Sequence, residues 1–371
     1  MRPSISRIVP VFMGLAPVAL GVITPPAAAQ AATPGPGPLG VAQSAAAPTD
    51  PVLGKRSVEA SRITRAVGRP RIVNVTSCRE SDLQAAIGKV ATVGGTVNLR
   101  RGCTYTLTDA APPNDDNGLP VIKSKVTING CGDTITRAAT AAEFRFFEID
   151  GPNGNLTLNA LTLSNGHAST SLGNGRGGAI WLNGTGPALT LNSTSLKTNT
   201  ADVFGGAIDN DNGAVRVTRS TLRNNKASSG GAVFVSPFGG SGTATLDRSR
   251  ITGNHASVLG GGIAAAVGTK TTLTSTQVTG NDVTGANAQG GGIAQAGTMT
   301  LKRSSKVSGN SATGANAHGG GIFTAGAPAP YPAVPSAATG KVHRLATPGA
   351  APRRVVASPS FPADFSAHST S

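Results

Sequence analysis

Two aspartates separated by one residue are the first place in this 371-residue sequence where chemistry could occur. Asp209 and Asp211 follow Ile208 in the run Ile-Asp-Asn-Asp-Asn-Gly. If this run is a strand and Ile208 faces inward, both carboxylates face outward, with Cα atoms about 6.5–7 Å apart. Carboxyl groups at such a separation can perform inverting glycoside hydrolysis, and His167 and Asp202 are candidate neighbours. Turns also prefer Asp, Asn and Gly, and a turn is the simpler interpretation of the run.

A set of basic residues forms the second candidate site, for binding. Residues 166–327 contain 12 lysines and arginines against 5 acidic residues, and the whole chain carries a formal net charge of +15. If successive strands stack about 5 Å apart, the basic side chains near the strand ends form a face that fits an extended polyanion, such as an acidic polysaccharide or a cell-envelope polymer. A charged face that only keeps the protein soluble is the simpler interpretation. The five candidates for binding are Arg216, Arg219, Arg248, Arg250 and Arg303.

The composition argues against several other functions. Only 13% of the residues are charged and 4% are aromatic, which is unusual for a helical cytosolic enzyme. Because side chains for base stacking are scarce, nucleic acid is a disfavoured partner. The sequence contains no readable nucleotide-binding or Ser-His-Asp motif, and we expect no cofactor. The five histidines and three cysteines show no metal-ligand spacing, so no metal site is predicted.

The elements that would position these residues repeat along the chain. Glycine accounts for 50 of 371 residues, and pairs or triplets of glycine recur just before an apolar residue in steps of 28, 25, 30, 30 and 29 residues. Two further rows of apolar residues advance with the first, and the second row lies three residues before an asparagine each time. The three rows are Ile180, Ile208, Val233, Ile263, Ile293 and Ile322; Leu196, Leu222, Ile251, Val278 and Val307; and Leu191, Val217, Leu246, Leu273 and Leu301.

A repeat of 25–30 residues with apolar residues at alternate positions predicts a solenoid of stacked strands. Leucine-rich repeats are excluded because the Leu/Asn spacing differs, and a propeller blade needs about 40 residues. We therefore predict an all-β, right-handed parallel β-helix of about eight coils. The glycine pairs are expected at corners that need positive φ and close contact between coils. The asparagines are expected to stack amide on amide, although a row of ligand-binding amides is the other interpretation.

The segments outside the repeats have different compositions. Residues 1–29 match a signal peptide, because two arginines precede an apolar stretch that ends at Ala27-Ala28-Ala29. We therefore expect a secreted, extracellular or cell-surface protein without a transmembrane segment after cleavage. Residues 30–70 predict a disordered Ala/Pro linker and residues 328–371 a disordered Pro/Ala tail. Residues 71–118 would form an N-terminal cap with the first strands, and residues 119–327 the β-helix repeats.

The predicted cap contains the one convincing helix of the mature chain. Ser81 to Gln84 matches a capping box, and Gly94-Gly95 ends the helical pattern. An odd number of cysteines allows at most one internal disulfide. We favour the pair Cys78 and Cys103, which flanks this short module and leaves Cys131 free.

The chain from Cys78 to Gly166 resembles the N-terminal part of secreted bacterial right-handed β-helix proteins of the pectin-lyase-like superfamily. The resemblance lies in the segments CRESDLQAAI, GCTYTLT and FRFFEIDGPNGNLTLNALTLSNG. The GGA[IV]/GGGI and [LIV]xxN repeats that follow resemble those of polymorphic outer membrane proteins, with Leu, Ile or Val in place of that family's Phe. The resemblance covers about residues 77–325 and implies the β-helix fold. It implies no single activity, because the superfamily includes lyases, hydrolases and adhesins.

The catalytic residues of the superfamily's enzymes have no counterpart in this sequence. Pectate-lyase-like chemistry needs clustered acidic calcium ligands and a basic proton acceptor, and polygalacturonase-like chemistry needs Asn-Thr-Asp, Asp-Asp and Gly-His-Gly. Neither set is present, and Gly166-His167-Ala168 matches only in part. We therefore expect a non-catalytic, adhesin-like protein that binds a surface or an anionic polymer. The alternative is a polysaccharide lyase or glycoside hydrolase acting on acidic polysaccharide, with Asp209 and Asp211 as its candidate catalytic residues.

Overall fold

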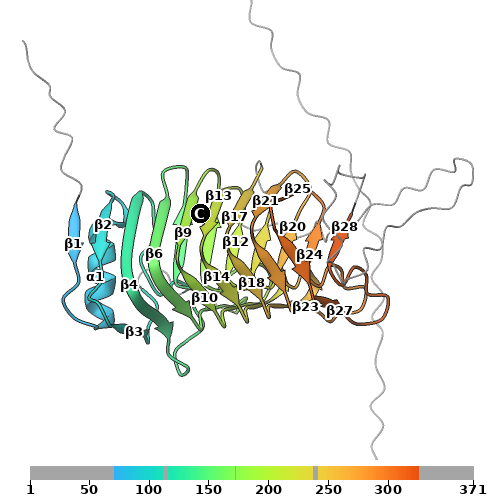
Figure 1. Cartoon of the computed structure of the whole chain (residues 1–371). Helices are drawn as coiled ribbons and strands as arrows, with labels where there is room; N and C mark the ends of the chain where they lie inside the picture. The colour runs from blue at the N-terminus through green and yellow to red at the C-terminus, as the bar shows by residue number, and fades with distance from the viewer. Residues whose placement is uncertain (1–70, 112–115, 172, 237–240, 326–371) are drawn as a thin grey trace, which may run out of the picture. The chain divides into compact units, whose positions relative to one another are not determined.

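The computed structural model describes residues 71–111, 116–171, 173–236 and 241–325 (Figure 1). The predicted signal peptide (1–29), linker (30–70) and tail (328–371) lie outside these residues. The described part is mostly β, with one helix near its N-terminal end and strands that stack in successive coils. None of its helices is long and apolar enough to cross a membrane.

The N-terminal cap consists of β1 (Ile72–Asn74), α1 (Glu80–Ala91), β2 (Gly95–Asn98) and β3 (Thr104–Leu107). α1 buries one face, formed by residues three or four apart, against the first strands. The predicted capping box at Ser81 is wrong. The helix begins at Glu80 with Arg79 as its N-cap and without a side-chain capping bond. The Ser77 hydroxyl instead accepts a hydrogen bond from the Arg79 N–H and donates one to Asp82 in the first turn.

A disulfide joins Cys78 to Cys103, which is the pair expected from the sequence. It connects the segment between β1 and α1 to the residue preceding β3, so it cross-links the cap on both sides of α1 and β2. Cys131 is free and exposed. It lies within β4 (Lys125–Arg137), at the point where that strand bends.

Every strand pairing in the solenoid is parallel, and the pairings form three sheets around about eight coils. The fifteen-stranded sheet contains β1 to β4, β6 (Asn155–Ser164), β9 (Ala188–Asn192), β10 (Ser195–Lys197), β13 (Ala214–Thr218), β14 (Thr221–Arg223), β17 (Thr243–Asp247), β18 (Arg250–Thr252), β21 (Lys270–Thr274), β22 (Gln277–Thr279), β25 (Thr298–Lys302) and β26 (Lys306–Ser308). The six-stranded sheet contains β7 (His167–Ala168), β11 (Thr200–Ala201), β15 (Lys226–Ser229), β19 (His255–Leu259), β23 (Asp282–Val283) and β27 (Ser311–Ala312). The seven-stranded sheet contains β5 (Phe147–Asp150), β8 (Ile180–Asn183), β12 (Ile208–Asn210), β16 (Val233–Val235), β20 (Ile263–Ala265), β24 (Ile293–Gln295) and β28 (Ile322–Thr324).

The strand register confirms the three apolar rows predicted from the sequence. Ile208 pairs with Ile180 on one side and with Val233 on the other, and the row continues to Ile322. The row through Leu222 and the row through Val217 are equally continuous. All three rows face the interior, where they join one hydrophobic core that also includes residues of the cap and of the first coils. Alternate residues therefore face outward, and their positions are fixed by the same register.

The glycine pairs occupy corners, as predicted. Gly230, the first of its pair, has φ +67, a conformation that side chains with a Cβ rarely adopt. A Cβ on its neighbour Gly231 would lie 2.2 Å from the carbonyl oxygen of Gly261 on the next coil. The first glycine therefore supplies the turn and the second supplies the close approach between coils.

Two inner polar rows join the coils. Asn254 represents the predicted asparagine row: its side-chain amide donates to the Leu222 carbonyl and to Asn281 Oδ1, at 3.0 and 2.8 Å. The predicted stacking of amide on amide is confirmed, and the amides also donate to backbone carbonyls of the preceding coil. A row of hydroxyls, which the sequence did not suggest, lies at the neighbouring bend, where the Ser220 N–H donates to Ser249 Oγ at 3.2 Å. Its members are Thr194, Ser220, Ser249, Thr276 and Ser305.

Candidate functional site

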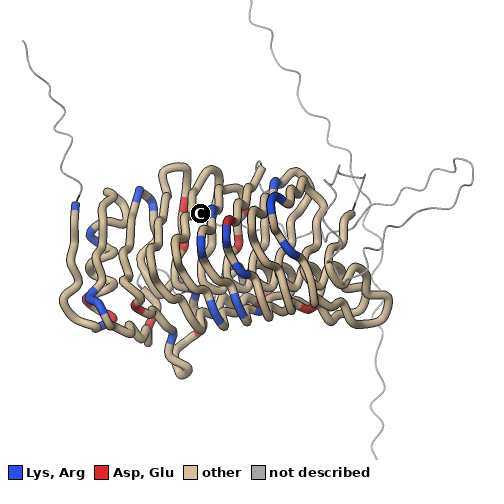
Figure 2. The backbone as a smooth tube through the Cα atoms, viewed as in Figure 1, with Lys and Arg blue, Asp and Glu red and all other residues tan. Residues whose placement is uncertain are grey.

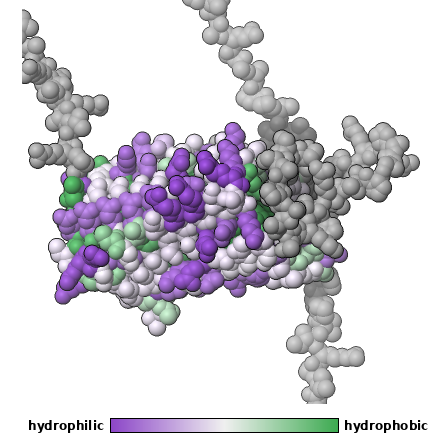
Figure 3. All heavy atoms as spheres, viewed as in Figure 1, coloured by the Kyte–Doolittle hydropathy of each residue, from purple (hydrophilic) through white to green (hydrophobic). Residues whose placement is uncertain are grey.

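All five arginines proposed for binding are exposed and belong to the outer face of the fifteen-stranded sheet or to its bend. Arg216 lies on β13 between Thr190 and Thr245 of the adjacent strands, and Arg250 lies on β18 next to Thr221. Basic segments recur across successive strands of this face in Figure 2. In Figure 3 hydrophilic side chains gather over the same strands. The register therefore places these arginines on one surface, as the sequence predicted.

Each coil from β9 onward contributes two consecutive strands to this sheet, such as β13 and β14, and the chain bends between them. Arg219, Arg248 and Arg303 lie at this bend. Each coil places one residue there with positive φ: Arg219 and Arg248 at +47° and Arg303 at +53°. Neighbouring coils carry Ser193 and Ser275 at the same position, with similar angles. Arg219 and Arg248 lie on adjacent coils, because the Arg219 N–H donates to the carbonyl of Asp247 on the next coil.

The charge on this face is almost entirely positive. Among the described strands of this sheet from β13 to β26, only β17 contributes an acidic residue, Asp247. Its carboxylate accepts hydrogen bonds from its neighbour Arg248, with Nη2 at 2.7 Å and Nε at 2.9 Å. Within the described part of the chain, Arg216, Arg219, Arg250 and Arg303 have no ion-pair partner. Four of the five guanidinium groups are therefore available to an anion from solution.

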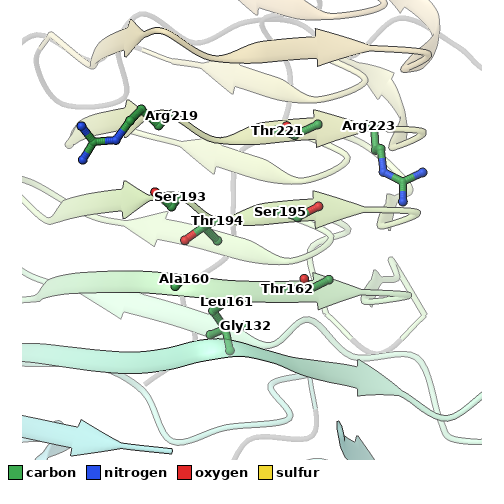
Figure 4. A pocket seen from close by; sticks show the side chains of 10 residues that line it. All are labelled: Gly132, Ala160, Leu161, Thr162, Ser193, Thr194, Ser195, Arg219, Thr221 and Arg223. Carbon is green, nitrogen blue, oxygen red and sulfur yellow. The ribbon is translucent and has the colours of Figure 1, made fainter. Parts of the chain in front are cut away.

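A shallow groove of about 320 Å³ runs along the bend at the N-terminal end of this basic face (Figure 4). It crosses four coils, from β4 to β14. Its lining is mostly small and hydroxylic, with two guanidinium groups at one end. The lining residues are Gly132, Ala160, Leu161, Thr162, Ser193, Thr194, Ser195, Arg219, Thr221 and Arg223.

Asp209 and Asp211 lie on the outer side of the sheet, as expected, but other side chains cover them. The Asp209 side chain has no exposed surface and that of Asp211 is 7% exposed. Arg176 binds both carboxylates, through Nε to Asp209 and Nη2 to Asp211, and the Trp181 Nε1–H donates to Asp211 at 3.0 Å. The Asn210 side chain between them closes a turn onto Gly213, which fits the turn interpretation of the run.

These carboxylates belong to a buried ionic cluster on the outer side of the seven-stranded sheet. Trp181 is the strand neighbour of Asp209, and the guanidinium groups of Arg145 and Arg176 lie 5.0 and 5.9 Å from its ring centroid. Arg145 is fully buried and pairs with Asp116 at 2.8 Å. We call Asp116, Arg145, Arg176, Asp209 and Asp211 the ionic cluster.

Burial dominates the protonation of the cluster. Desolvation is the main cause that raises the pKa of Asp211, to about 7, and the nearby charge of Asp209 raises it further against the opposing effect of Arg176. Desolvation also raises the pKa of Asp209, whose Oδ1 is buried and has no hydrogen-bond partner among the described residues. Because Arg176 holds both carboxylates and little of either is exposed, the cluster in this conformation fits a structural role better than attack on a polymer.

His167 and Asp202 lie side by side, but on the six-stranded sheet. The His167 ring nitrogens lie 3.2 Å from Asp202 Oδ1 and 3.2 Å from Glu143 Oε1. Burial would raise the pKa of Asp202, but hydrogen bonds from Thr170 and His167 bring it below its ordinary value. A second shallow pocket of about 360 Å³ adjoins this histidine, and its lining includes Arg137 and Thr200.

The sequence interpretation missed Arg145, Arg176 and Trp181 as neighbours of the aspartates. The repeat contained the signal for one of them, because the same step that links Ile208 to Ile180 links Asp209 to Trp181. Arg176 lies just before its glycine pair, in the row that Phe204 occupies one coil later. Arg145 lies before the regular repeat begins, and its position followed from no pattern.

No protein-family model matches the sequence, and searches of curated proteins and of solved structures also gave no match. The parallel β-solenoid is established by the register of the chain's own strands. Among the described residues, no group of three or more His, Cys, Asp or Glu side chains is arranged to hold a metal ion.

Proposed function

We propose that this chain is a secreted or cell-surface, non-catalytic β-solenoid that binds an extended anionic polymer through the arginine face. The observation that carries the proposal is the alignment of Arg216, Arg219, Arg248, Arg250 and Arg303 on one exposed face, with Asp247 as its acidic residue. Parallel strands lie about 4.8 Å apart, so the charges recur at a spacing that a polymer can follow along the coils. An acidic polysaccharide or another cell-envelope polymer is the proposed partner.

Two sequence features support the proposed location and class. The predicted signal peptide directs the chain out of the cytoplasm. The resemblance to pectin-lyase-like β-helix proteins and to polymorphic outer membrane repeats suggests a relative of secreted adhesins. Both features are parts of the proposal.

Binding of the full chain to polygalacturonate at 20 and 300 mM NaCl tests this function. We expect binding at low salt that weakens steeply at high salt, because counterions are released when the arginines bind anions. Replacing Arg216, Arg219 and Arg250 with Gln should weaken low-salt binding at least tenfold. The matched control replaces Arg79, Lys89 and Arg101 of the cap with Gln. These three residues are also exposed, and their replacement removes the same amount of charge. Equal losses in both triple variants, or no low-salt binding by the unmodified chain, would refute the proposal.

The alternative is a polysaccharide lyase or glycoside hydrolase that uses Asp209 and Asp211. The pKa of about 7 for Asp211 is the observation in its favour, because a carboxyl group that holds a proton near neutral pH can act as a general acid. Release of unsaturated uronides or reducing ends from polygalacturonate, alginate or hyaluronan would establish it. Activity that disappears in Asp211→Asn would assign the site.

A further inference from the structure

The groove at the bend differs in chemistry from the arginine face that it joins. The bend gives it a concave shape, because Ala160 and Ser193 have φ of +49° and +50° and turn the strands at this point. Its volume of about 320 Å³ lies at the lower end of the range for small-molecule sites. Four coils contribute to it, so its long direction follows the stacking of the coils, as does the arginine face (Figure 4).

The floor of the groove presents a row of free hydroxyl groups. Thr162, Ser195 and Thr221 are paired in register on β6, β10 and β14, and all three face outward and are half-buried. Within the described residues, their hydroxyls make no hydrogen bond to the protein. The Thr194 hydroxyl beside them is different, because it is already bonded to the carbonyls of Leu158 and Asn192. Each free hydroxyl can both donate and accept, which matches the hydroxyl groups of a polyol.

The two ends of the groove complete its chemistry. Ala160 and Gly132 form a small apolar end above the buried Leu161, which suits the C–H face of a sugar ring. Arg219 and Arg223 are exposed at the opposite end and have no ion-pair partner among the described residues. The lining contains no acidic residue. A ligand that fits all three features is uncharged over the hydroxyl row and anionic beside the arginines.

We propose that the groove binds one neutral sugar unit, with its hydroxyl groups on Thr162, Ser195 and Thr221 and its ring against Ala160. This inference rests on the proposed function. It implies that the bound polymer is a heteropolymer in which a neutral sugar lies next to anionic groups. A linear polyphosphate could accept hydrogen bonds from the row, but it has no hydroxyl to donate in return and no C–H face to place against Ala160. The groove therefore provides selectivity and the arginine face provides charge-dependent affinity.

The test uses saturation-transfer NMR and titrations of the full chain with D-glucose, D-galactose and N-acetyl-D-glucosamine. At least one of these sugars should bind saturably. Ser195→Trp, which fills the groove, should abolish the signal. The milder double variant Thr162→Val/Thr221→Val should weaken binding at least fivefold by removing two hydroxyls without changing the side-chain shape. Thr272→Val/Thr300→Val, at outward positions outside the groove, should change binding less than twofold.

The outcomes separate this inference from the proposed function. Polygalacturonate binding by Ser195→Trp should stay within threefold of the unmodified chain, because the arginine face remains. If none of the three sugars binds saturably, or if Ser195→Trp leaves sugar binding unchanged, the inference is overturned while the proposed function stands. If sugar binds in the groove but polygalacturonate does not bind at low salt, the proposed function fails and the sugar site remains.

Discussion

At the scale of single residues, burial decides what the two central aspartates can do. The spacing of Asp209 and Asp211 in the sequence predicted which side of the strand they face, but it could not show which side chains cover them. Arg176 comes from the preceding coil and Trp181 from the neighbouring strand, so the partners are more than 25 residues away. The two aspartates look suited to hydrolysis in the sequence, but in the fold they are buried and both paired with Arg176. Local spacing carries no information about burial, which is set by other coils.

Protonation of Asp211 should make stability depend on pH. Its pKa is raised from the ordinary 3.8 to about 7, so the folded state holds the proton more tightly than the unfolded state. The resulting stabilisation is complete below about pH 4 and is lost as the pH rises through about 7. Asp211→Asn should flatten this part of the curve, measured as the free energy of unfolding in urea between pH 4 and pH 8. Asp247→Asn, on the arginine face, is the control and should run parallel to the unmodified chain. If the curve of Asp211→Asn also runs parallel to that of the unmodified chain, the raised pKa of Asp211 is contradicted.

At the scale of elements, the repeats were predictable because each coil obeys the same constraints. The apolar rows, the glycine corners and the asparagine row each require one residue type at a fixed offset, and all are visible as repeated letters. The hydroxyl row was missed because it contains both serine and threonine, which are common at surface positions. The helix start was also missed, because the helix begins at Glu80, one residue before the predicted capping box, and without a side-chain capping bond.

Gly231 should be among the least replaceable residues of the solenoid. In Gly231→Ala the new Cβ would meet backbone oxygens of Gly261 and His255 at 2.2 and 2.5 Å, and backbone cannot move aside as a side chain does. We expect a loss of at least about 3 kcal/mol in the free energy of unfolding, at the upper end of overpacking costs. Gly88→Ala is the matched control. Its Cβ would lie 3.9 Å from the nearest heavy atom, so α1 should gain about 0.5–1 kcal/mol. Chemical denaturation of both variants measures the difference, and a similar small effect in both would contradict the corner geometry.

At the scale of the described solenoid, each coil contacts mainly its neighbours along the stack. The sequence predicted this architecture from the period and from the alternation of apolar residues, and it predicted the arginine face because register transfers from one coil to the next. It could not predict the groove, which depends on how far the strands bend at Ala160 and Ser193. Stability in such a stack is approximately a sum of coil terms and nearest-neighbour terms. A substitution that destabilises one end of the stack should therefore increase unfolding only in the coils near that end.

The disulfide of the cap provides the test of that locality. Cys78 and Cys103 close a loop with a sequence separation of 25, which corresponds to about 3 kcal/mol of stabilisation in the chain-entropy account. The double variant Cys78→Ser/Cys103→Ser should lose about that much, because the unfolded cap gains freedom while the coils keep their contacts. Hydrogen exchange should rise in α1, β2 and β3 and stay unchanged from β17 onward, since several coils separate the two regions. Uniformly faster exchange through β28 would mean that the stack unfolds as one cooperative unit, and the nearest-neighbour description would then fail. Local loss would also leave polymer binding intact at Arg248, Arg250 and Arg303, so the low-salt affinity for polygalacturonate should change less than threefold in this variant.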